Sequence, residues 1–172
     1  MLRNRIIGPG EYLVSDDPMD LLVAYGLGSC LGIGMYDTRK NIGGLAHVVL
    51  PGVINGNVGN SSNYVDFGIQ SLVKQMRSVG ASTENIIVCL AGGANMLVSI
   101  SSSNNFDIGS RNIEAALHIL EKMNMKIIGQ ETGGNVGRTI RVYISDGRVT
   151  CRVIGGQEVN LNEIITNTSI RM

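Results

Sequence analysis

The sequence contains no tryptophan, and aromatic residues make up only 4% of its 172 residues. This scarcity argues against a protein that stacks single-stranded nucleic acid on aromatic platforms. Net charge is also missing, because 14 lysines and arginines balance 14 aspartates and glutamates. A chain without net charge is a poor binder of phosphate backbones. With 16% charged and 44% apolar residues, the composition is that of a folded domain and not of a disordered chain.

Long apolar segments, metal-ligand clusters and nucleotide-binding motifs are lacking too. The longest apolar run, Ile86–Ala91, is far too short to cross a bilayer, and no apolar signal-peptide segment follows the basic first residues. The two histidines and three cysteines are scattered, so they form neither a zinc motif nor a disulfide framework. No P-loop or complete dinucleotide fingerprint occurs. We therefore expect a cytoplasmic protein in a reducing compartment, with no metal, no cofactor and no membrane insertion.

Glycine, by contrast, is abundant. Its 23 copies are nearly twice the average usage of about 7%, and without a collagen period they indicate turns and close backbone approaches. Short apolar runs and two stripes at helical spacing predict one layered α+β domain over residues 1–156, followed by a polar C-terminal tail over 157–172. The expected strands are 11–14, 21–26, 31–36, 42–50, 86–91, 126–129 and a hairpin over 140–154. The expected helix stripes are Val65, Ile69, Leu72, Val73 and Met76, and, after a cap at Ser110, Ile113, Ala116, Leu117 and Leu120.

Elimination singles out one cysteine and one histidine. His118 lies on the polar face of the second helix, where an exposed surface histidine is expected. Cys89 and Cys151 lie in apolar strands, where a free thiol behaves as a small hydrophobe. Cys30 instead follows two small residues in a tight turn, and His47 lies amid apolar residues of a strand. A buried imidazole must be hydrogen-bonded or functional.

A hairpin would bring these two residues together. If residues 37–40 form the loop, Tyr36 faces Asn41, and counting back places Cys30 opposite His47. Directly opposed side chains lie close together on one face of a sheet. A register error of one residue would place them on opposite faces.

Such a pair supports nucleophilic catalysis. An adjacent histidine lowers the pKa of the Cys30 thiol, and the resulting imidazolium then protonates a leaving amine. The backbone N–H groups of Gly28, Ser29 and Cys30 are candidates for an oxyanion hole. The alternative is a buried cysteine that merely neighbours a hydrogen-bonded core histidine.

Several motifs, in order, resemble those of the chemoreceptor glutamine deamidase family, CheD. The first is the Gly-Leu-Gly-Ser-Cys segment ending at Cys30, followed 17 residues later by the histidine of Gly-Leu-Ala-His47 and then by Leu-Pro51. The resemblance covers the chain from about Gly8 to Gly156. The other matching segments are Leu90–Met96, Ile108–Asn112 and Thr132–Thr139.

The resemblance implies a specific activity. Family members convert glutamine side chains of methyl-accepting chemotaxis receptors to glutamate, with Cys30 in the position of the nucleophile and His47 in that of the general base and acid. It implies a mixed or antiparallel β-sandwich-like core flanked by helices, similar to the catalytic domains of glutamine-deamidating toxins. It also implies two partners, the cytoplasmic domains of chemotaxis receptors and a CheC-type phosphatase.

One position departs from the family pattern. The family usually carries a threonine six residues before the cysteine, as the third member of a triad, and here that position is Ala24. A backbone carbonyl or another hydroxyl must then orient His47, or catalysis is weakened. The hydroxyl candidates are those of Tyr25, Ser29, Ser61 and Ser62. An adaptor that binds receptor or phosphatase with little turnover, and a different cysteine amidase or peptidase, remain the alternatives.

Overall fold

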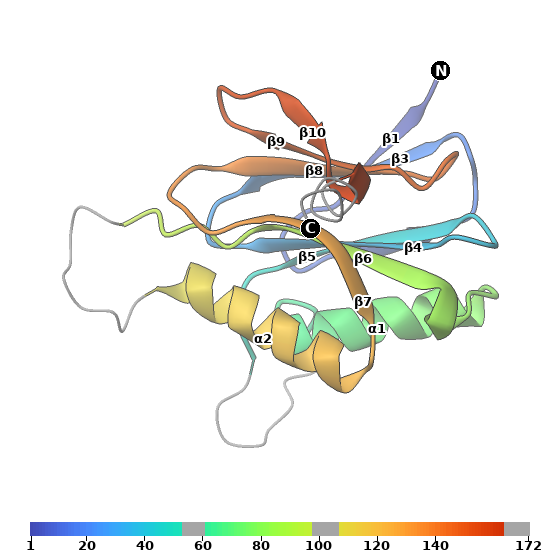
Figure 1. The fold of residues 1–172 in the computed structure, drawn as a ribbon, viewed down its shortest axis with the longest axis horizontal. Helices are drawn as coiled ribbons and strands as arrows, with labels where there is room; N and C mark the ends of the chain where they lie inside the picture. The colour runs from blue at the N-terminus through green and yellow to red at the C-terminus, as the bar shows by residue number, and fades with distance from the viewer. Residues whose placement is uncertain (53–60, 98–106, 164–172) are drawn as a thin grey trace, which may run out of the picture.

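Two β-sheets lie face to face, and two helices cover the outer face of one of them (Figure 1). The computed structural model describes residues 1–52, 61–97 and 107–163. The first sheet has the order β1 (Arg3–Ile6), β3 (Asp20–Leu27), β8 (Arg138–Tyr143), β9 (Val149–Val153) and β10 (Glu158–Asn160). The second sheet has the order β2 (Tyr12–Ser15), β5 (Ile42–Val48), β4 (Leu31–Asp37), β6 (Ile86–Gly92) and β7 (Lys126–Thr132). Helices α1 (Val65–Ser78) and α2 (Ile108–Lys122) both pack on the second sheet.

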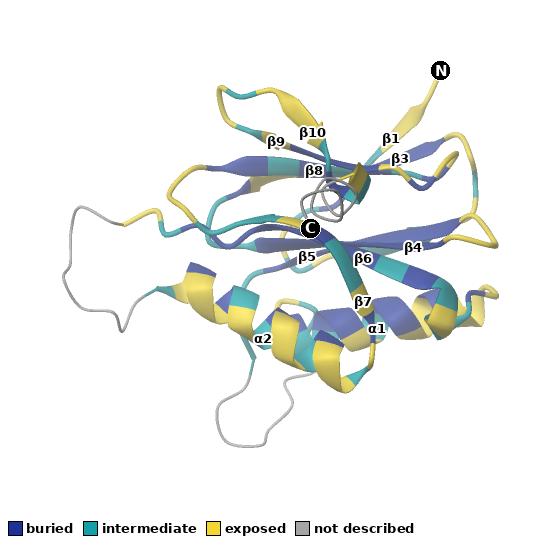
Figure 2. Ribbon diagram, viewed as in Figure 1, coloured by how far each residue is buried: buried dark blue, intermediate teal, exposed yellow. Residues whose placement is uncertain are grey.

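Strand β4 shows why the layers form as they do. Its large residues Leu31, Ile33 and Met35 belong to the core between the second sheet and the helices. Its glycines face the first sheet, where a Cβ atom on Gly32 would lie 2.7 Å from a methyl group of Ile140. The alternation of large residues and glycine therefore lets the two sheets approach closely, and the buried residues lie in these two layers (Figure 2). The expected α+β class with a sandwich-like core is confirmed.

The helices follow their predicted stripes with two differences. All five apolar positions of α1 are buried, as expected. Helix α2 begins earlier than predicted, because Asp107 is its N-cap and accepts a hydrogen bond from the backbone N–H of Ser110, at 3.0 Å. Ser110 therefore lies inside the first turn. Leu117 is 38% exposed, whereas Asn112 occupies the buried face together with Ala116 and Leu120.

The folded region extends beyond residue 156. Strand β10 pairs with β9, and the short 3-10 helix Leu161–Glu163 follows it. Leu161 is fully buried between the sheets, and its carbonyl oxygen is so close to Gly129 that no side chain would fit there. Residues 158–163, predicted as part of the tail, thus belong to the folded domain, and Leu161 lies in its core. The segment is polar apart from Val159 and Leu161, which is why its composition resembles that of a tail.

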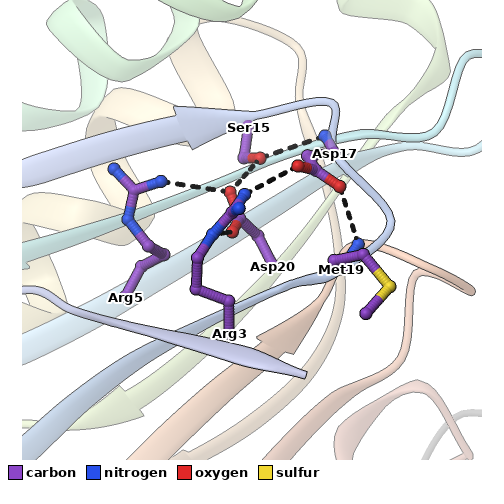
Figure 3. A network of polar contacts seen from close by, with 6 residues as sticks. All are labelled: Arg3, Arg5, Ser15, Asp17, Met19 and Asp20. Carbon is purple, nitrogen blue, oxygen red and sulfur yellow. Dashed lines mark hydrogen bonds and ion pairs between the residues drawn. The ribbon is translucent and has the colours of Figure 1, made fainter. Parts of the chain in front are cut away.

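A buried aspartate fixes the start of the chain to the first sheet (Figure 3). Asp20, only 2% exposed, accepts hydrogen bonds from Arg3 at 2.6 Å, Arg5 at 3.3 Å and the Ser15 hydroxyl at 2.7 Å. Burial alone would raise the pKa of Asp20, but these donors and the two arginine charges outweigh burial and hold it below its ordinary value. Because Arg3 and Arg5 belong to β1, this network anchors β1 along β3 in parallel register.

Candidate active site

Cys30 lies in the short turn that carries the chain from β3 in the first sheet to β4 in the second. Two carbonyls of this turn accept hydrogen bonds from the end of β6: Gly28 from the Ala94 N–H and Cys30 from the Gly93 N–H, each at 2.8 Å. Gly92 has a φ of +110°, and a Cβ atom there would overlap the Cys30 carbonyl oxygen. The glycine-rich end of β6 therefore holds the half-buried Cys30 by close backbone contact.

Asn112 supports the same turn from α2. Its fully buried side-chain amide donates to the carbonyl of Ser29 at 2.8 Å and to that of Val49 at 3.0 Å. One side chain thus ties the segment before Cys30 to the end of β5. Asn112 was not among the candidates chosen from the sequence. Two features could have indicated it: it is a polar residue on the core face of a helix, and it lies in one of the segments that carry the family resemblance.

His47 lies on the same face of the second sheet as Cys30, but not directly opposite it. The register pairs His47 with Gly32, one pleat further along β4. The predicted register was therefore wrong by two residues. A shift of two residues keeps both side chains on the same face of the sheet, and diagonal neighbours lie within reach of a long side chain.

The hairpin loop explains this shift. The loop comprises residues 38–41, because Asp37 still pairs with Ile42. The Asp37 carboxylate accepts hydrogen bonds from the backbone N–H groups of Arg39 at 2.9 Å and Lys40 at 3.0 Å. Asn41 closes the loop with a φ of +54°. Moving a four-residue loop by one position shifts the strand register by two.

The hydrogen bonds of His47 define its tautomer. The side chain is 2% exposed, and Nδ1 lies 3.1 Å from the carbonyl oxygen of Ile7. A carbonyl can only accept, so we assign the proton to Nδ1 and the lone pair to Nε2. Nε2 is buried and has no hydrogen-bond partner within the described residues. The imidazole therefore holds a free proton acceptor inside the protein.

Both members of the pair are neutral at rest. Burial raises the pKa of the Cys30 thiol, and the Cys30 backbone N–H only partly offsets this effect. Burial also lowers the pKa of His47, against the opposing influence of the Ile7 carbonyl and the Glu11 charge. The sequence predicts a preformed thiolate, but the structure favours a neutral thiol and a neutral imidazole, because burial disfavours the charged form of each group.

A backbone carbonyl, and not the side chain at position 24, contacts Nδ1 of His47. Ala24 is fully buried in β3, and Ile7 runs alongside it, with the Ile7 N–H donating to Val23 at 2.8 Å. Since Nδ1 of His47 bonds to Ile7 and Nε2 has no partner, none of the four candidate hydroxyls orients the ring. The backbone carbonyl was one of the options that the sequence left open.

We expect Ala24→Thr to bring no gain in rate. The Ile7 carbonyl already holds Nδ1, and Ala24 is fully buried, so threonine would add two heavy atoms to a packed site. Overpacking at such a site costs about 1–3 kcal/mol, so urea unfolding should show a loss of stability while the turnover rate stays within about two-fold. A clear rise in rate at unchanged KM would instead show that the ring is poorly held.

One of the three predicted oxyanion donors is already engaged within the turn. The Gly28 N–H donates to the Gly26 carbonyl at 3.0 Å, which closes the tight turn. This contact removes Gly28 from the predicted set. The backbone N–H groups of Ser29 and Cys30 stay as candidates, next to the thiol.

The second histidine and the other two cysteines lie away from the Cys30 turn and His47. His118 is exposed on α2. Cys89 and Cys151 are buried, and burial raises the pKa of each thiol to about 12. Over the described ranges, no three histidine, cysteine or acidic side chains gather as metal ligands would. Nor does this part of the chain contain a helix with the length and hydropathy needed to cross a membrane.

A half-buried cysteine and a buried histidine with an unpartnered Nε2 thus lie on one face of the second sheet, as candidates for a cysteine–histidine site. Comparison with known proteins identifies the family: the model for CheD chemotactic sensory transduction matches residues 49–153. A probable chemoreceptor glutamine deamidase CheD from Symbiobacterium thermophilum is 38% identical over 161 residues, covering 92% of this chain and 98% of the relative. Its counterpart from Pyrococcus abyssi is 40% identical with the same coverage. The chemoreceptor glutamine deamidase CheD of Thermotoga maritima is 34% identical, covering 93% of this chain and 99% of the relative. The chain belongs to the CheD family.

Proposed function

We propose that this protein deamidates glutamine side chains of chemotaxis receptors, with Cys30 as nucleophile and His47 as general base and acid. The observation that carries the proposal is the buried, unpartnered Nε2 of His47 on the sheet face that also bears Cys30. The family relatives, which are named chemoreceptor glutamine deamidases, support the choice of substrate.

The neutral pair fits a general-base mechanism. As Sγ of Cys30 attacks the carboxamide carbon of glutamine, the thiol proton passes to Nε2 of His47. The imidazolium then returns this proton to the departing nitrogen, and ammonia leaves behind a thioester. Water attacks the thioester, Nε2 accepts a proton from the water, and the proton goes back to the thiolate as glutamate is released.

The turn around Cys30 supplies the electrostatic part of this reaction. Negative charge develops on the substrate oxygen in both tetrahedral intermediates, and backbone N–H groups close to the nucleophile stabilise such charge. The N–H groups of Ser29 and Cys30 have the matching position. The contacts from Gly93, Ala94 and Asn112 to this turn hold its carbonyls and so fix the direction of its amides.

The partner of this activity is the cytoplasmic domain of a chemotaxis receptor, which places the protein in the cytoplasm. A CheC-type phosphatase is a second proposed partner, implied by the resemblance of the sequence motifs. An adaptor with little turnover is the competing function, and the alanine at position 24 is the feature that favours it. The Ile7 carbonyl weakens this alternative, because it orients His47 without a threonine.

Intact-mass spectrometry of a purified receptor cytoplasmic fragment tests the function. After incubation with the protein, we expect each modified glutamine to gain the mass difference between a carboxamide and a carboxylic acid. The same fragment with its modified glutamines replaced by asparagine serves as the control. A fragment that binds but keeps its mass would support the adaptor, and a cleaved fragment would indicate a peptidase.

A further inference from the structure

The turn Gly8-Pro9-Gly10-Glu11 runs along the backbone of His47. It has the pattern of a type II turn, with proline second and a glycine of φ +80° third, and the Glu11 N–H donates to the Gly8 carbonyl at 3.0 Å. The backbone carbonyl of Glu11 then accepts from the backbone N–H of His47 at 3.0 Å, and the Gly10 N–H donates to the His47 carbonyl at 2.8 Å. The turn and the histidine therefore form one hydrogen-bonded unit.

A single peptide group lies between the Glu11 carboxylate and the His47 ring. Its N–H, that of Gly8, donates to Oε2 of Glu11 at 2.7 Å. Its carbonyl, that of Ile7, accepts from Nδ1 of His47 at 3.1 Å. Carboxylate, peptide and imidazole thus form a continuous chain of hydrogen bonds. Each bond in such a chain polarises the next, and a bond to an ionised acceptor is the strongest kind.

The same peptide is fixed from its other side. Ile7 is buried, and its N–H donates to the Val23 carbonyl at 2.8 Å. The preceding strand β1 is anchored through Arg3 and Arg5 to Asp20 (Figure 3). These contacts leave the Ile7–Gly8 peptide plane free to rotate. The Glu11 carboxylate fixes this rotation by accepting a hydrogen bond from the Gly8 N–H.

We propose that Glu11 is a positioning residue for His47, acting through the Ile7–Gly8 peptide group in place of a side chain at position 24. This inference rests on the proposed deamidase function. When Sγ of Cys30 gives its proton to Nε2, the ring becomes an imidazolium with a proton on each nitrogen. The polarised Ile7 carbonyl and the negative charge of Glu11 then stabilise this cation.

Among the described residues, one charged side chain shifts the pKa of His47. Glu11 is the charged side chain whose field raises the pKa of His47, and Cys30 is the titratable group on the reacting side. Arg5 and Glu11 line the same open pocket of about 450 Å³, but the Arg5 guanidinium bonds to Asp20 at 3.3 Å. The field of Glu11 at the histidine is therefore not cancelled by a direct Arg5–Glu11 ion pair.

The test uses two substitutions that separate charge from hydrogen bonding. Glu11→Gln keeps an oxygen that accepts from Gly8 but removes the charge, and Glu11→Ala removes both. Glu84→Gln and Glu84→Ala are matched controls, because Glu84 is exposed in the 3-10 helix Thr83–Asn85 that precedes β6. The pKa and tautomer of His47 are read by nitrogen NMR of the imidazole. A His118→Gln variant assigns the signals, since the chain has only two histidines.

We expect both Glu11 variants to lower the pKa of His47, because a negative charge that raises it is gone. Turnover should fall about three-fold in Glu11→Gln and about ten-fold in Glu11→Ala, with KM unchanged, and both Glu84 variants should match the wild type. A merely structural role would leave the pKa in Glu11→Gln where it was.

Unchanged pKa and turnover in both Glu11 variants would overturn the proposal, whatever their thermal stability. If the wild-type chain deamidates no receptor, the proposed function fails. The pKa and tautomer of His47 still show whether Glu11 positions the ring. If Glu11→Ala does not fold, the isosteric Glu11→Gln variant decides alone.

Discussion

Cys30→Ala should abolish deamidation of a receptor fragment and leave the fold intact. The thiol is the nucleophile in the proposed mechanism, and removing a nucleophile costs at least about 10³-fold in turnover. Cys30 lies in a turn and is half-buried, so the loss of one sulfur atom should change the unfolding free energy by less than about 1 kcal/mol. Intact-mass assays and urea unfolding measure the two effects.

Cys89→Ala is the control for this substitution. Cys89 is fully buried between the sheets, so its truncation should destabilise the protein by about 1–2 kcal/mol through lost packing, while turnover per folded molecule is retained. Activity that survives Cys30→Ala but is lost in Cys89→Ala would reverse the assignment.

Thiol alkylation gives an independent measure of the same site. Cys30 should react first, since burial raises the pKa of Cys89 and Cys151 to about 12 and makes both thiols inaccessible to the reagent. The Cys30 rate should keep rising as the pH is raised above neutral, because its pKa lies above the ordinary value and thiolate accumulates only there. A rate that levels off below neutral pH would reveal a preformed thiolate–imidazolium pair instead.

Gly92→Ala should be among the most damaging single substitutions in the protein. The residue has a φ of +110°, and a Cβ atom would overlap the Cys30 carbonyl oxygen. Backbone strain of about 1–2 kcal/mol adds to about 1–3 kcal/mol of steric displacement, so we expect a loss of about 2–5 kcal/mol in the unfolding free energy. In the folded fraction, a displaced nucleophile should lower turnover about 10²-fold.

Gly155→Ala separates the strain from the overlap. Gly155 also has a positive φ, +77°, but a Cβ atom there meets nothing within 4 Å. It should therefore lose only the strain energy and keep its activity. If Gly92→Ala destabilises the protein no more than Gly155→Ala does, the close contact between β6 and the Cys30 turn is not a constraint on the fold.

Features that depend on residue type and local spacing could be predicted from the sequence. The large residues and glycines of β4 alternate because one face packs on helices and the other on a neighbouring sheet. The helical spacing of five apolar residues predicted the buried face of α1. Elimination among three cysteines and two histidines selected Cys30 and His47, and the spaced motifs indicated the family that the comparisons confirm.

How these residues are held depends on contacts between segments far apart in the chain. The register depended on which residue capped the hairpin loop, and Asp37 did so with its carboxylate. The partner of His47 is a backbone carbonyl, which every residue possesses and which therefore leaves no mark in a sequence. The protonation of the pair follows from burial, a property of the assembled sheets. Residue identity thus singled out the two groups proposed to react, and long-range packing set their neighbours, their charge and their orientation.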